Sequence, residues 1–147
     1  MKRYAIVMIC VGLLTMKAFG GTLSDIQAAR TLSDQVAARL TEGQSSEAVE
    51  LFKPYWPMPE EEIDALIKQI ENQAIMIYTR FGSVLDVEFV TRQQVSDSLV
   101  RFIYLQKHEK HAIRWLFTFY KPRDIWLVNG IYFDDKVSEL FEMKSIQ

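Results

Sequence analysis

The sequence predicts an α+β fold in which three N-terminal helices pack on a curved four-stranded antiparallel meander sheet, followed by a short C-terminal helical turn. Apolar residues recur every three or four positions up to about residue 81, and beyond Gly82 the period changes to two. The turns between the later apolar segments are short, so neighbouring strands are expected to be antiparallel. A chain of 147 residues that is 49% hydrophobic and 24% charged also has the composition of one ordinary globular domain.

Three segments carry the helical pattern. The first helix begins near Ser24 and has an apolar stripe formed by Ile26, Ala29, Leu32, Val36 and Leu40. A second, short helix is expected over residues 46–52, with Ser46 as its capping residue. The third begins at Pro59, because proline suits the first turn and the glutamates that follow suit the positive end of the helix dipole. It is expected to run to about residue 81 and to end at Gly82.

Four strands are expected after these helices. Val87 and Phe89 alternate with acidic residues, which predicts a first strand that ends at a turn over residues 95–98. The longer strands that follow are expected at residues 99–107, 112–121 and 125–133. A hairpin turn at Asn129-Gly130 is the less favoured alternative, because it would leave only about four residues on each side. The terminal helical turn is expected over residues 134–141, with three apolar residues packing back on the domain: Val137, Leu140 and Phe141.

Residues 1–21 are typical of a secretory signal peptide. Lys2 and Arg3 precede an uncharged, mostly apolar segment that ends at Met16, and small residues follow it. This segment is shorter than the roughly 20 residues that a membrane-spanning helix needs. We therefore expect cleavage after Gly20 or Gly21, which leaves residues 22–147 as a single periplasmic or secreted α+β domain without stable membrane insertion. An uncleaved membrane anchor is the alternative.

Composition and motifs exclude several classes of protein. Seventeen basic residues against nineteen acidic ones produce no general positive field, so no nucleic-acid partner is expected. The only cysteine, Cys10, lies within the predicted signal peptide, which excludes thiol catalysis by the mature chain. Phosphate-binding loops, dinucleotide fingerprints and nucleophile elbows are missing, and no cofactor is expected. His108 and His111, with Glu109 between them, are expected to be solvated turn residues and not metal ligands.

Residues 117–134 combine an aromatic strand, a Lys121-Pro122 turn and a second strand that contains Trp126. This segment resembles the closing hairpin of small exported bacterial proteins of the nuclear transport factor two-like superfamily, which have a cystatin-like cone. Helices that precede a curved sheet are also similar to that superfamily. The resemblance implies a cone-shaped fold that serves isomerases, dehydratases, small-ligand carriers and protein-binding modules alike. Its isomerase-like members place an acidic base inside the cone, often with a tyrosine or histidine, and no local motif identifies such a base here.

The last three strands are apolar on both faces, which one layer of helices does not explain. Such a sheet either curls around a cavity or presents its outer face to a partner, and a well-packed aromatic core is the alternative. The candidate binding residues are Arg101, Tyr104, Arg114, Trp115, Tyr120, Trp126 and Tyr132. Arg92, Arg101 and Arg114 interrupt apolar strands. Either Arg101 or Arg114 holds a ligand carboxylate in a pocket, or the arginines lie on solvated strand faces. In the latter case the partners would be the nearby acidic residues Asp86, Glu88 and Asp97.

Taken together, the sequence predicts an exported, non-enzymatic binding or oligomerisation module that uses its aromatic-rich curved sheet. Its candidate partners are a second copy of the chain, another exported protein or a small hydrophobic ligand. The alternative function is that of a lyase or isomerase acting on a small hydrophobic substrate inside the cone, with Tyr104, Tyr120 or Asp134 near the site. A buried carboxylate or tyrosine that points into an open cavity would favour the enzyme.

Overall fold

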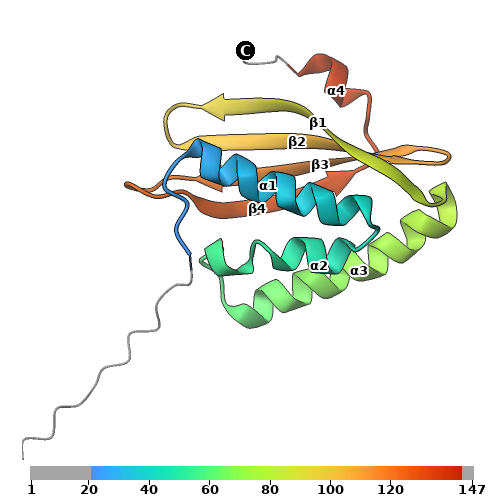
Figure 1. Cartoon of the computed structure of the whole chain (residues 1–147), viewed down its shortest axis with the longest axis horizontal. Helices are drawn as coiled ribbons and strands as arrows, with labels where there is room; N and C mark the ends of the chain where they lie inside the picture. The colour runs from blue at the N-terminus through green and yellow to red at the C-terminus, as the bar shows by residue number, and fades with distance from the viewer. Residues whose placement is uncertain (1–20, 144–147) are drawn as a thin grey trace, which may run out of the picture.

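The computed structural model describes residues 21–143 of the chain, so the predicted signal peptide lies outside the described residues except for Gly21. The predicted α+β fold is confirmed. Three helices lie on one face of a four-stranded antiparallel sheet whose strands follow the chain order β1-β2-β3-β4 (Figure 1). Within residues 21–143, none of the helices has the length and hydropathy that a bilayer span requires.

The first two helices form where the sequence predicts them. Helix α1 (Ile26–Thr41) begins after Asp25, whose carboxylate accepts a hydrogen bond from the backbone N–H of Ala28 at 2.7 Å. Helix α2 (Ser45–Glu50) begins one residue earlier than expected. The expected serine cap is wrong, because the N-cap residue is Gln44, whose side chain makes no capping hydrogen bond.

Prolines then separate α2 from the longest helix. A short 3₁₀ helix, η1 (Lys53–Tyr55), follows α2 and was not expected from the sequence. Helix α3 (Glu60–Phe81) begins directly after Pro59 and ends at Gly82, as predicted. The φ angle of Gly82 is 85°, a conformation that residues with a side chain rarely adopt.

The four strands are close to their expected positions. They are β1 (Val84–Val95), β2 (Leu99–His108), β3 (Ala112–Tyr120) and β4 (Leu127–Asp134). Asn129 and Gly130 continue β4, as predicted, but with a β-bulge. Thr118 pairs with Gly130 and Phe119 pairs with Val128, so Asn129 is an extra residue on β4.

The hydrophobic core lies between the three helices and the inner face of the sheet. Its aromatic part consists of Phe52, Trp56, Phe102, Tyr104, Trp115, Phe117, Phe119 and Trp126, each at most 5% exposed. This packing explains why so many aromatic residues occur in the last strands. The other face of the sheet has its own smaller set of buried apolar residues, including Ile103 and Leu116.

A fourth helical segment lies on the outer face of the sheet, opposite the other three (Figure 1). This segment, α4 (Glu139–Glu142), is a single turn, and the preceding Val137 and its own Leu140 are half-buried. The expectation that Phe141 packs back on the domain is wrong, because its side chain is 91% exposed. Successive residues of a helix point about 100° apart, so one turn that buries Leu140 directs its neighbour away from the sheet.

Candidate functional site

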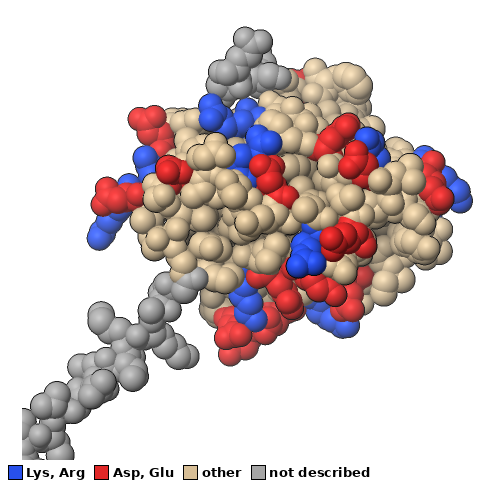
Figure 2. All heavy atoms as spheres, in the orientation of Figure 1, with Lys and Arg blue, Asp and Glu red and all other residues tan. Residues whose placement is uncertain are grey.

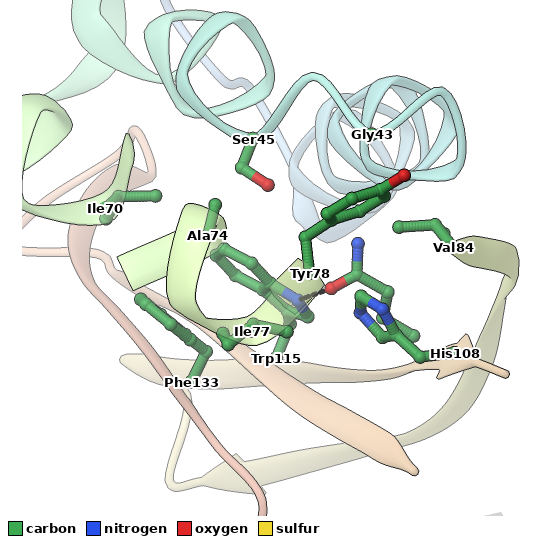
Figure 3. Close-up of a pocket in the computed structure, with 11 residues that line it drawn as sticks. Gly43, Ser45, Ile70, Ala74, Ile77, Tyr78, Val84, His108, Trp115 and Phe133 are labelled. Carbon is green, nitrogen blue, oxygen red and sulfur yellow. Dashed lines mark hydrogen bonds between the residues drawn. The ribbon is translucent and has the colours of Figure 1, made fainter. Parts of the chain in front are cut away.

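A largely enclosed cavity of about 50 Å³ lies between the C-terminal half of α3 and the inner face of the sheet (Figure 3). We refer to it as the α3 cavity. Its walls are mainly apolar, with Ala74 and Ile77 contributed by α3 and Trp115 and Phe133 by the sheet. The rings of Trp115 and Phe133 stack with their centroids 4.4 Å apart, which makes this part of the wall rigid.

His108 brings a polar atom to this cavity. It is the last residue of β2, and only 8% of it is exposed. Its Nδ1 lies 2.8 Å from the carbonyl oxygen of Gly82. Because a carbonyl oxygen only accepts, Nδ1 carries the proton in this contact, and in the tautomer protonated at Nδ1 alone Nε2 is an acceptor. That Nε2 is buried and has no hydrogen-bond partner among the described residues.

The expectation that His108 is a solvated turn residue is therefore wrong. The strand extends one residue further than predicted, and inward-facing residues of β2 have even numbers, as Phe102 and Tyr104 show. His108 continues this series and points toward α3, where Gly82 covers one edge of its ring. The alternation of inward- and outward-facing residues along β2 was the sequence signal that could have identified His108 as a buried residue. His111, by contrast, is partly exposed in the turn, where its ring contacts that of Phe81.

Gln106 also lines the cavity, but both ends of its side chain have partners. Its Nε2 donates to the carbonyl oxygen of Leu40 at 3.1 Å. Its Oε1 accepts from the indole Nε1 of Trp115 at 2.9 Å, a hydrogen bond drawn in Figure 3. Gln106 therefore fixes the indole that forms the wall and connects it to the end of α1. His108 Nε2, by contrast, lies beside the cavity without a partner among the described residues, and the hydroxyl of Ser45 also lines the cavity.

Burial is uneven along α3, and this bears on access to the cavity. Its fully buried residues, Ile63, Ile67 and Ile70, all lie in the first half of the helix. The inward-facing residues of the second half are only half-buried. Two open grooves of about 400 and 280 Å³ flank this second half, and they share Ile77 and Tyr78, respectively, with the α3 cavity. The cavity and the two grooves are therefore separated only by side chains of this half of the helix that they share.

Three of the candidate binding residues, Tyr104, Trp115 and Trp126, are buried in the core. Of these, Trp115 lines the α3 cavity. Tyr104 instead donates its hydroxyl hydrogen to Asp34 of α1 at 2.6 Å. Burial and this hydrogen bond raise the pKa of Tyr104 above its ordinary value, so the phenol stays protonated at neutral pH and cannot serve as a base there. Tyr120 is 41% exposed at the end of β3.

The other candidates, Arg101, Arg114 and Tyr132, lie on the outer face of the sheet and line one hollow beside α4. The expectation that Arg114 lies on a solvated face is wrong, because it is 3% exposed. Its partners are also not the expected ones: it pairs with Asp134, directly opposite on β4, and with Glu139 of α4. Arg114 is buried because α4 lies over this part of the outer face of the sheet.

The acidic residues that were expected to face the arginines have other positions. Asp86 and Glu88 of β1 both pair with Lys107 of β2, at 3.0 and 3.3 Å. These exposed pairs contribute little to stability. Charged side chains of both signs are scattered over the face shown in Figure 2. Within residues 21–143, no group of three or more His, Cys, Asp or Glu side chains is arranged to hold a metal ion.

Comparison of the chain with models of protein families, with curated proteins and with solved structures found no match in any of the three. The fold and its two sites define an α+β protein that has an enclosed cavity beneath a helix and a basic hollow on the opposite face of its sheet.

Proposed function

We propose that this protein binds a small, mainly apolar ligand in the α3 cavity, and that a hydroxyl or N–H group of the ligand donates a hydrogen bond to Nε2 of His108. The observation that carries this proposal is the buried, unpaired Nε2 beside an apolar cavity. An unpaired buried acceptor costs about 1–3 kcal/mol, and a ligand donor would remove that cost.

The volume of the cavity limits the size of the ligand. A site that holds one water molecule needs about 10–15 Å³, so 50 Å³ accommodates a group of only a few non-hydrogen atoms. A larger ligand would require the second half of α3 to move outward and connect the flanking grooves. The apolar walls favour a ligand that has one polar group and an otherwise aliphatic or aromatic surface.

Binding is favoured over catalysis by the residues that surround His108. None of the described residues that line the cavity is acidic, so no carboxylate within it is placed to act with His108. Tyr104 is a hydrogen-bond donor to Asp34 and does not line the cavity. The lyase or isomerase that the sequence allows as an alternative would need a second group that moves a proton at the same site. The hydroxyl groups that line the cavity belong to Ser45 and to Tyr78, which is 60% exposed.

The experiment compares 2-propanol with acetone, which has the same number of non-hydrogen atoms but no donor. The readouts in the labelled protein are the ¹⁵N shift of the His108 ring and, for comparison with the variants, the backbone amide shifts of Ala74 and Ile77, which line the cavity. We expect 2-propanol to shift the Nε2 resonance saturably, with a dissociation constant of roughly 1–100 mM for so small a ligand. His108→Phe should abolish binding, and His111→Phe is the matched control. Equal effects of the two solvents, or no saturable shift, would contradict the proposal.

We further propose that the protein is exported and belongs to the nuclear transport factor two-like superfamily. The charged start and apolar segment of residues 2–16 support export. The helices that precede an antiparallel sheet, and the cavity between them, support the superfamily. N-terminal sequencing of the protein from an exporting cell tests the first proposal. A mature start at Gly21 or Thr22 is expected, and a membrane-bound form that retains Met1 would contradict it.

A second candidate function is self-association through the second half of α3. Ile75, Met76, Tyr78 and Leu85 are each at least 60% exposed on this half of the helix and on the start of β1. Together with the inward-facing Ala74, Ile77 and Phe81, they make residues 74–81 apolar nearly all round, a pattern typical of a helix that is buried. A second copy of the chain is the partner that we propose for this surface.

A further inference from the structure

The outer face of the sheet has a hollow of about 420 Å³, separated from the α3 cavity by the sheet itself. Strands β2, β3 and β4 form its floor, and Glu139 of α4 lies on one side. Gly130 lies in the floor opposite Thr118, and no atom lies within 4 Å of the place that a Cβ would occupy. The glycine and the neighbouring bulge at Asn129 therefore leave the floor open.

Arg114 provides a buried guanidinium at this hollow. Its Nε and Nη2 donate to the two carboxylate oxygens of Asp134, and Nη2 also donates to Glu139. Nη1 is buried and has no hydrogen-bond partner among the described residues. Arg114 therefore places a positive charge at the floor of the hollow and has one donor group left unpaired.

Two further cations, Arg101 and Lys136, line the same hollow. Nε of Arg101 donates to the hydroxyl of Thr118 at 3.1 Å, which orients the side chain. Neither cation lies within 4.0 Å of a carboxylate among the described residues. Three cations thus share the hollow with the two carboxylates that contact Arg114. One bound carboxylate would balance these charges, whereas a dianion would be repelled by Asp134 and Glu139.

The remaining lining residues indicate what the carboxylate is attached to. Leu116 and Met143 give the hollow a small apolar side, and Tyr132 also lines it, whereas the side chain of Ile131 packs against the core on the other face. A short aliphatic chain could cover these residues while its carboxylate faces the cations. We propose that the outer-face hollow binds a small organic acid with a short apolar chain, whose carboxylate is held by Arg101 and Lys136 above the positive charge of Arg114.

The test uses hexanoate as the probe and hexan-1-ol as its uncharged counterpart, with backbone amide shifts of Thr118, Gly130 and Tyr132 as the readout. Hexanoate should shift these amides saturably, and hexan-1-ol should not. Arg101→Gln, which retains a polar group for Thr118, should weaken hexanoate binding about tenfold, the usual effect of losing one charge-assisted hydrogen bond. Arg92→Gln is the matched control, because it removes the same charge from β1 outside the hollow.

Lys136→Gln provides a second variant at a solvent-exposed position, where folding is not at risk, and should weaken binding about threefold. An unchanged affinity in Arg101→Gln, equal binding of hexan-1-ol, or the absence of saturable shifts would each overturn the proposal. The readout is separate from the ring of His108, so failure here would leave the proposed function of the α3 cavity standing.

Discussion

The backbone N–H of Trp126 donates to the carbonyl oxygen of Leu23 at 2.8 Å, which connects the segment before α1 to the start of β4. Both side chains are buried, at 3% and 4% exposure. The Nζ of Lys121 lies 5.4 Å from the centre of the indole, on its outer side. Trp126 therefore closes one end of the core and holds the N-terminal segment in place.

Replacing Trp126 with alanine should lower the free energy of unfolding by about 3–5 kcal/mol, because a large buried ring leaves a cavity. Phe141→Ala is the control. It removes an aromatic ring that is 91% exposed and should change stability by less than about 0.5 kcal/mol. The midpoint of denaturant unfolding measures both effects, provided that the dependence of the unfolding free energy on denaturant concentration is unchanged. An unchanged midpoint for Trp126→Ala would show that the ring is not part of the core.

Gln106→Leu should destabilise the protein by about 2–4 kcal/mol, because it leaves the indole N–H of Trp115 and the carbonyl of Leu40 unpaired. Combining it with Trp115→Phe should cost less than the sum of the two single changes, since the double variant has no unpaired indole. Gln69→Leu, at an exposed position of α3, is the matched control. Additive costs in the double variant would contradict the pairing.

Gly82→Ala should cost more stability than Gly43→Ala, although both glycines have positive φ angles, of 85° and 75°. A Cβ at Gly82 would lie 2.1 Å from Oε2 of Glu109 and 3.0 Å from its Cβ, whereas a Cβ at Gly43 would meet nothing within 4 Å. Backbone strain adds to the difference, because Gly82 combines its positive φ with a ψ of −169°, a conformation that is essentially restricted to glycine and costs about 1–3 kcal/mol for other residues. Thermal or denaturant unfolding measures the difference, and equal costs would contradict the prediction.

The pH dependence of stability should reflect the pair between Arg114 and Asp134. The hydrogen bond from Arg114 lowers the pKa of Asp134 below its ordinary value of 3.8. Its contribution is therefore present above about pH 4, the unfolded pKa of aspartate, and is lost as the pH falls through the lower folded value. The stability gap between the wild type and Asp134→Asn should be widest near neutral pH and should narrow below pH 4. Asp97→Asn, in the exposed β1–β2 turn, should show no narrowing.

If the exposed half of α3 mediates self-association, the wild type should associate at roughly 10–100 µM. Met76→Lys should raise the dissociation constant at least tenfold, because it places a charge in the apolar interface. A tenfold change corresponds to about 1.4 kcal/mol. Ala65→Lys adds the same charge at an exposed position in the first half of α3 and is the matched control. Sedimentation velocity measures both. A wild type that stays monomeric throughout this range would contradict the proposal.

The fold could be predicted because its signals are local. Pro59, the glutamates after it and Gly82 mark both ends of α3, and alternation marks the strands. The site depended on details that single-sequence patterns do not contain. One additional strand residue turned His108 from a turn residue into a cavity residue. The partner of Arg114 was decided by the register between β3 and β4 and by the position of α4.

The uneven burial of α3 has a consequence for how the native structure fluctuates. Isoleucines anchor the first half of the helix, whereas the second half is held mainly by half-buried contacts above the cavity. Local opening should therefore begin at residues 74–81 and leave the sheet intact, with amide hydrogens exchanging faster there than at residues 63–70. In that partly open state His108 would meet bulk water. Any ligand that fills the cavity should consequently slow amide exchange at the C-terminal end of α3, which forms one wall of the cavity.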